Sequence, residues 1–134
     1  MADLSVTAAN VQSVPGATIK TGSAGASITA GEPVFIDSTD SLTKPAANTG
    51  DAASRVEGIA LHAAETGQPI KYIAAGDIDM GAVLTVGELY ILSGAGAVSP
   101  AGDAITGDWI TYLGIATAAD NLKLNIQASG VQLA

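Results

Sequence analysis

Ile28-Thr-Ala-Gly-Glu-Pro-Val-Phe-Ile-Asp37 joins a glycine turn to a short run of β-forming residues. Gly31 can take a positive φ angle, which lets the chain turn tightly into whatever follows it. Pro33 stands directly before Val34-Phe-Ile36, a place where proline is tolerated at the start of a strand. The stretch therefore predicts a turn followed by a β-strand.

The same turn recurs 56 residues further along the chain, as Leu84-Thr-Val-Gly-Glu88. The same offset aligns Gly58-Ile-Ala60 with Gly114-Ile-Ala116, and other matching segments follow in the same order. Glycines inside such strands indicate bulges or a close approach of a neighbouring backbone. We therefore predict two equivalent β units, at residues 20–75 and 76–131.

Further strand signals are short apolar runs bounded by Gly, Asn, Asp and Ser. They lie at residues 56–61, 69–73, 83–92, 109–116 and 122–126. Apolar residues do not recur at helical spacing over any long stretch, although Asp51 could cap one helical turn. Short strands at this spacing predict an all-β fold, a small β-barrel or β-sandwich of two pseudo-repeated units. We place an extended N-terminal arm at residues 1–19 and a single β domain at 20–134.

The composition is that of one small domain with many small apolar side chains. Of the 134 residues, 48% are hydrophobic but only 4% are aromatic. Because transfer free energy scales with apolar area, such a core gains from burying further surface against a partner. The chain holds 13 acidic and 5 basic residues, a net charge of −8, and the basic residues are scattered. Direct binding of nucleic acid or of an anionic membrane is therefore not expected.

The sequence has no cysteine, which excludes disulfides, thiolate metal sites and a cysteine nucleophile. The first residues lack the basic and apolar regions of a secretory signal, and no run reaches the roughly 18 apolar residues of a spanning helix. We expect a protein made in the cytoplasm.

Candidate residues for chemistry do not combine into a catalytic pattern. His62 is the single histidine, without a paired nucleophile, and we expect a surface or half-buried structural side chain. Asp77 and Asp79 share one strand face, but two ligands are too few for a Ca²⁺ site. Asp37 and Asp40 are typical turn formers. We therefore expect no catalytic residue, no metal and no cofactor.

The glycine-rich pieces Gly22-Ser-Ala-Gly25 and Gly94-Ala-Gly96 lack the ending of a phosphate-binding loop and are predicted to be plain loops. The larger aromatic side chains each lie on a strand pattern, which favours a core position over an interface position. They are Tyr72, Tyr90, Trp109 and Tyr112.

The opening Asp3-Leu-Ser-Val-Thr-Ala-Ala-Asn-Val11 and several later segments, including the turn and strand quoted first, resemble capsid decoration (cement) proteins of tailed bacteriophages. The segments are residues 3–11, 28–37, 56–64, 67–69, 81–87, 113–117 and 122–131. They follow one another in order along nearly the whole chain, from residue 3 to residue 131.

The resemblance implies a β-rich protein on the outside of an icosahedral shell, often a homotrimer, that clamps neighbouring subunits against the pressure of packaged DNA. Its partners would be the major capsid protein and further copies of itself, and the family has no catalytic residues to carry over. The arm could lie on the capsid as an added strand, through apolar side chains spaced along it. These are Leu4, Val6, Val11 and Val14.

Two other readings stay open at this point. One is a different virion part, such as a head fibre or a tail component. The other is a carbohydrate-binding β module, in which Trp109 and the tyrosines would form a stacking platform.

Overall fold

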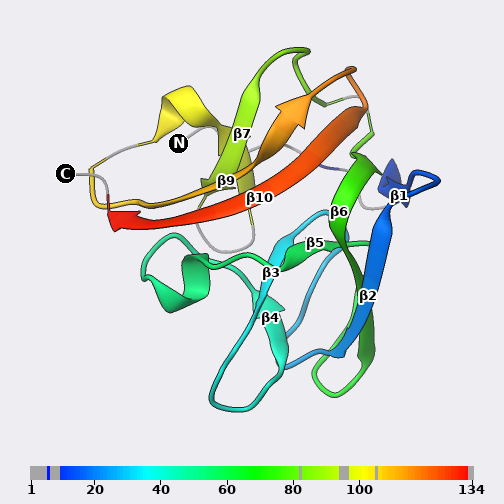
Figure 1. Ribbon diagram of the computed structural model, residues 1–134. Coiled ribbons are helices and arrows are strands. Elements are labelled where there is room, and N and C mark those ends of the chain that lie inside the picture. The colour runs from blue at the N-terminus through cyan, green and yellow to red at the C-terminus, as the bar shows by residue number, and fades with distance from the viewer. Residues whose placement is uncertain (1–5, 7–9, 82, 94–96, 105, 133–134) are drawn as a thin grey trace.

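The computed structural model describes residues 6, 10–81, 83–93, 97–104 and 106–132. They form one curled antiparallel sheet of ten strands, so the predicted all-β, barrel-like fold is confirmed (Figure 1). The strands are β1 (Gln12–Ser13), β2 (Thr18–Ser23), β3 (Pro33–Ile36), β4 (Thr43–Pro45), β5 (Gly58–Ala60), β6 (Pro69–Asp79), β7 (Leu89–Ser93), β8 (Ala97–Pro100), β9 (Trp109–Ala116) and β10 (Asn121–Gln132). Two single 3₁₀ turns, η2 (Ala52–Ser54) and η3 (Ala101–Asp103), complete the described elements.

Strand β6 connects the two halves of the molecule. Its beginning pairs with β2 and β5, and its end pairs with β1 and β10. The main path of the sheet runs β4-β3-β5-β6-β10-β9-β7-β8. Figure 1 accordingly shows β2 to β5 below and β7, β9 and β10 above, with β6 running between them. One strand therefore belongs to both halves.

The strand pairing follows the repeat offset predicted from the sequence. Strand β3 pairs with β5 as β7 pairs with β9, and each residue pair moves by the same 56 positions. Val34 lies opposite Gly58 in the first half, and Tyr90 lies opposite Gly114 in the second. The next strands in the sheet are equivalent as well, because β4 pairs with β3 and β8 pairs with β7.

The two glycine turns make the same hydrogen bonds. The Gly31 N–H donates to the carbonyl of Ala60 over 2.8 Å, and the Gly87 N–H donates to the carbonyl of Ala116 over 2.8 Å. Gly31 has a φ of 88° and Gly87 a φ of 84°, as predicted for a tight turn into the next strand. Each turn is therefore tied to the strand that pairs with it.

The strand glycines Gly58 and Gly114 allow a close backbone approach, as predicted. A side-chain carbon at Gly58 would collide with the carbonyl oxygen of Ile73, and one at Gly114 with that of Lys123. Since both obstacles are backbone atoms of the neighbouring strand, neither can move aside without breaking the sheet.

Each half encloses buried apolar side chains at equivalent positions. The first half curls around its own small cluster, and a bridge between Ala24 and Thr43 joins the end of β2 back to β4. The equivalent buried residues are Ile28 and Leu84, Val34 and Tyr90, and Ala60 and Ala116. Tyr72 and Tyr90 lie in these cores, as their strand positions predicted.

Several boundaries differ from the sequence prediction. Strands β1, β2, β4 and β8 were not predicted, and Gly22 and Ser23 belong to β2 rather than to a loop, whereas the loop predicted at residues 94–96 lies outside the described residues. The run at residues 83–92 becomes a strand only at Leu89, because the turn at Gly87 precedes it. The helical turn predicted near Asp51 is present as η2, without a capping bond from the Asp51 side chain.

The described part of the predicted N-terminal arm lies on the sheet. Gln12 and Ser13 pair with the end of β6, and Thr18 and Ile19 already belong to β2. Val11 is only 6% exposed, within the larger core cluster. Pairing and burial offset the entropy lost when this segment becomes ordered on the domain. From Asn10 onward, the chain does not extend away from the domain.

Candidate functional site

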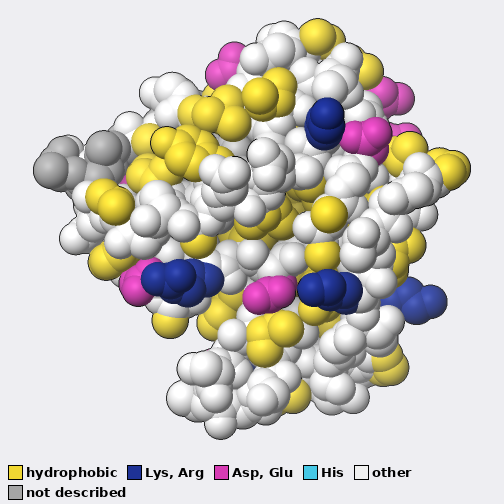
Figure 2. Space-filling view, viewed as in Figure 1, with side chains coloured by type: hydrophobic (Ala, Val, Ile, Leu, Met, Phe, Trp, Pro, Cys, Tyr) yellow, Lys and Arg dark blue, Asp and Glu magenta, His cyan; other side chains and the backbone are white. Residues whose placement is uncertain are grey.

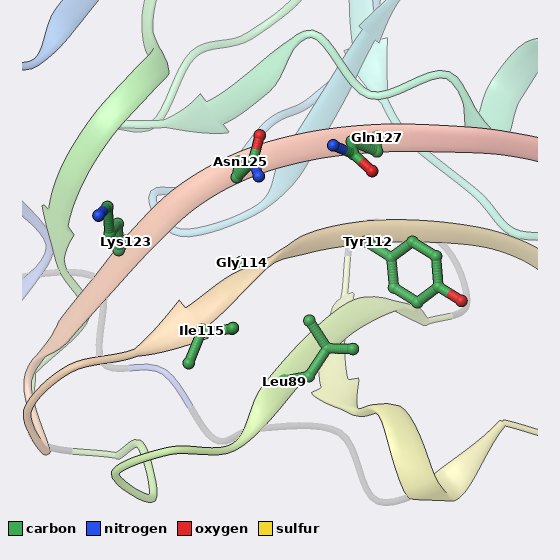
Figure 3. A pocket seen from close by; sticks show the side chains of 7 residues that line it. All are labelled: Leu89, Tyr112, Gly114, Ile115, Lys123, Asn125 and Gln127. Atoms are coloured by element: carbon green, nitrogen blue, oxygen red, sulfur yellow. The ribbon is translucent and has the colours of Figure 1, made fainter.

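A shallow groove of about 390 Å³ lies on the face of β7, β9 and β10 that is turned away from the core. Figure 3 shows its side chains rising from these three strands, and Figure 2 shows hydrophobic side chains gathered over β7 and β9. Tyr112 is 40% exposed and Ile115 is 50% exposed, although both are large apolar side chains. The lining residues are Leu89, Tyr112, Gly114, Ile115, Lys123, Asn125 and Gln127.

An irregularity in β9 brings Tyr112 and Ile115 to the same face. In a regular strand, residues three apart point to opposite faces. Here the pairing of β9 with β7 shifts register beside Gly114, and its pairing with β10 shifts in the same region. Leu113 and Ala116 are therefore buried while Tyr112 and Ile115 both face solvent. Gly114 forms the floor of the groove between them.

Polar side chains form one border of the groove. Lys123, Asn125 and Gln127 alternate along β10 and point to its exposed face. They offer an ammonium and two amides, and the lining holds no carboxylate. An apolar floor bordered by one ammonium group and two amides suits a contact with another apolar surface. The lining contains no pair of nucleophile and base.

His62 is half-buried, as expected, and its ring lies against backbone groups. The backbone N–H of Lys71 donates to its Nε2 over 3.1 Å, and its Nδ1 lies 2.9 Å from the carbonyl of Ala63. The ring is half-buried and extends the hydrogen bonding between β5 and β6 by one more bond. Both ring nitrogens are therefore engaged with backbone.

Asp37 and Asp40 form the turn between β3 and β4, as predicted. Asp37 accepts from the N–H of Thr39 and Asp40 from the N–H of Leu42, each over 3.0 Å. Lys44 Nζ lies 2.9 Å from an oxygen of each carboxylate. The Lys44 hydrogen bond, followed by that of Thr39, holds the pKa of Asp37 well below its usual range. Both carboxylates are thus already bound within the chain.

Asp77 and Asp79 lie on β6, as predicted. Asp79 accepts a hydrogen bond from the Gly81 N–H over 2.9 Å, which ties it to the turn after the strand. In residues 10–132, leaving aside the few that are not described, no three His, Asp or Glu side chains gather as a metal site would require.

The aromatic side chains divide between core and surface. Tyr72 and Tyr90 are buried, and the Tyr90 hydroxyl accepts from the N–H of Thr85 over 2.8 Å. The core position predicted for Tyr112 is wrong, since the register shift in β9 turns it outward. Trp109 is half-buried.

The predicted contact residues of the arm are spread over different environments. Leu4 lies outside the described residues, whereas Val6 and Val14 are half-buried. Val11 is buried in the core of its own chain and would have to leave it to reach a partner. Their contact with a capsid stays a prediction.

Sequence reasoning missed the groove, because Leu89 and Ile115 were read only as strand residues. The repeat aligns Ile115 with Ile59, but only the structure shows that Ile59 is buried and Ile115 exposed.

Among the described elements, neither 3₁₀ turn is long and apolar enough to cross a membrane. No model of a known protein family matches the chain, and no curated protein matches it.

Proposed function

We propose that this chain is a structural virion protein that decorates the outside of an icosahedral phage capsid and clamps neighbouring major capsid subunits without catalysis. The observation that carries the proposal is the resemblance to decoration proteins, whose segments run through both halves of the fold. Residues 28–37 contain the first glycine turn and β3, and residues 81–87 contain the equivalent turn. The segments that carry the resemblance thus include the equivalent turns of both halves.

A protein of this kind would stabilise a capsid through many contacts whose binding free energies add up. A single contact with a capsid subunit can be weak, because identical contacts repeat over the whole shell and a protein that bridges two subunits gains from multivalency. A closed homotrimer matches the symmetry of a three-fold position on the shell. The partners in this proposal are the major capsid protein and further copies of the chain.

The charge of the chain agrees with a place on the outer surface. A net charge of −8 with scattered cations is repelled by packaged DNA, and it favours docking on a basic patch of another protein. In this proposal the protein is made in the host cytoplasm and joins the outer capsid surface of the virion.

The test is a thermal-release assay on DNA-filled capsids with and without the purified protein. Because the protein binds the assembled shell in preference to the ruptured one, it should raise the temperature at which DNA becomes accessible to a dye. An unrelated acidic protein of similar size serves as the control. Identical rupture temperatures at saturating occupancy would remove the cement role.

A head fibre or a tail component is a second kind of structural virion protein, attached elsewhere on the particle. Electron microscopy of virions carrying a labelled copy of the protein separates these possibilities. Label distributed over the capsid faces supports decoration, and label confined to one vertex or to the tail supports the other virion parts.

A carbohydrate-binding module is the second candidate, favoured by the exposed ring of Tyr112 beside the amides of Asn125 and Gln127. Sugars stack on such rings and hydrogen-bond to such amides. However, Tyr72 and Tyr90 are buried and contribute nothing to a stacking platform. A saccharide titration followed by protein fluorescence, repeated on Tyr112→Ala, tests this candidate.

A further inference from the structure

Equivalent faces of the two halves differ in whether another part of the chain covers them. In the first half, Ile59 on β5 lies opposite Ile73 on β6, and both side chains are 0% exposed. They belong to the same buried cluster as Leu122 and Leu124 of β10. The outward face of β5 and β6 is therefore covered by the second half of the molecule.

The equivalent face of the second half is uncovered. The repeat places Ile115 where the first half has Ile59, and the pairing register places Lys123 where the first half has Ile73. Ile115 is 50% exposed, and Tyr112 beside it is 40% exposed. The groove in the second half is thus equivalent to the face of the first half that packs against the rest of the same chain.

The groove lining carries less negative charge than the chain as a whole, which lowers the repulsion between two copies that meet there. The chain has 13 acidic and 5 basic residues, so two copies that approach at random repel each other. The groove lining has one lysine and no carboxylate. The lining itself therefore brings no carboxylate into the contact with a second copy, and Asp77 of β6 lies opposite Lys123 at the border of the groove.

Other large exposed apolar side chains are scattered. Among the described residues, Tyr112 and Ile115 share one groove, whereas the remaining four lie outside its lining, on β2, on β3, in the turn before β7 and near the end of β10. Single exposed apolar residues are normal for a protein surface, but a contiguous group marks an interaction site. The remaining four are Ile19, Ile36, Val86 and Val131.

We propose that the β7–β9–β10 face is the surface on which a second copy of this chain docks, with Tyr112 and Ile115 as its apolar anchors. This deepens the self-association included in the proposed function by naming its surface. Large side chains at the centre of a contact carry most of its binding energy, and a polar rim excludes water around them. A stable interface takes about 800 Å² from each partner, so the contact extends beyond the groove over the exposed strands around it.

The test is the mass of the purified protein in solution, measured by sedimentation velocity over a concentration series. The chain has a mass of 13.1 kDa, and we expect the wild type to sediment as a multiple of it. Ile115→Asp should shift the protein to the monomer, because a carboxylate then enters the apolar contact. Ile19→Asp on β2, where the native side chain is 46% exposed, is the matched control and should assemble like the wild type.

Circular dichroism shows whether Ile115→Asp keeps its fold, and Tyr112→Ser is a second, milder variant of the same face. A monomeric wild type at every concentration overturns the proposal, and so does wild-type assembly by a folded Ile115→Asp protein. Equal dissociation by Ile19→Asp also overturns it, since the effect would then not depend on this face.

These outcomes are independent of the capsid assay. A protein that assembles through this face but leaves the rupture temperature of capsids unchanged would support the docking surface and remove the cement role. A monomer that still raises the rupture temperature would support the cement role and remove the docking surface. Saccharide binding that is lost in Tyr112→Ser, together with a monomeric wild type, would assign the groove to a glycan instead.

Discussion

Lys44 holds the turn between β3 and β4 through two carboxylates, Asp37 and Asp40, at 2.9 Å each. Hydrogen bonds from Lys44 first, and from Thr39 second, lower the pKa of Asp37. A backbone bond from Leu42, and then the bond from Lys44, lower the pKa of Asp40. All three charged side chains remain partly exposed to water, so solvent weakens the pairs. The turn is therefore a local source of pH-dependent stability.

We predict that Lys44→Met lowers the stability of the protein at neutral pH and that this difference shrinks in acid. A carboxyl whose pKa is lowered by folding stabilises the fold above its unfolded pKa of about 3.9. That contribution is lost as the pH falls through the lower folded value. Urea unfolding of both proteins from neutral pH downward measures the difference, with Lys20→Met as the control. A difference that is the same at every pH would show that Lys44 acts by packing rather than by charge.

At the scale of the elements, the spacing of β9 and β10 depends on Gly114. The carbonyl of Lys123 occupies the place that a side chain at Gly114 would need. A Cβ atom at Gly114 would also lie only 3.1 Å from the Cα of Leu124. The same contact shapes the groove, because it accompanies the register shift that turns Tyr112 and Ile115 to one face. The glycine therefore serves both the sheet and the exposed surface.

We predict that Gly114→Ala destabilises the protein by about 1–3 kcal/mol, the usual cost of forcing an extra carbon into a filled space. Gly50→Ala is the control, since nothing lies within 4 Å of the added carbon there. Urea unfolding followed by circular dichroism measures both. Equal stability of the two variants would contradict the close approach of the strands.

At the scale of the whole molecule, the two halves are built into one cooperative unit. Strand β6 belongs to both halves, and the larger core cluster contains side chains from both. The loop before β5 also contacts β9: the N–H of Trp109 donates to the carbonyl of Asn48 over 2.9 Å, and the hydroxyl of Thr111 donates to that of Ser54. Neither half can unfold without exposing part of the other.

We therefore predict a single unfolding transition. Fluorescence of Trp109, the only tryptophan, reports the second half, and far-ultraviolet circular dichroism reports the entire sheet. The two signals should change at the same urea concentration, as two-state unfolding requires. Thr111→Val, which removes a buried donor, should shift both signals together by about 1 kcal/mol. Separate transitions would show that the halves are independent.

Local chemistry was sufficient to predict the elements that depend on few residues. Gly31 and Gly87 sit in turns because glycine alone takes their φ angles at little cost. The core of β3 and the whole of β9 follow from apolar and β-branched runs, and the repeat offset predicted two equivalent units, which agrees with the equivalent pairing of β3 with β5 and of β7 with β9. In each case the determining groups lie close together in the chain or recur at one fixed spacing.

Other features depend on groups that come together only in the folded chain. Strand β2 is polar and contains Gly22, so its sequence indicates a loop, yet β6 supplies the backbone partners that make it a strand. Val11 becomes a core residue because β1 pairs with the end of β6. Ile59 and Ile115 occupy equivalent places in the repeat, but one is buried and the other half exposed. Burial depends on what packs against a side chain, and the partner of each residue is set by the path of the whole chain.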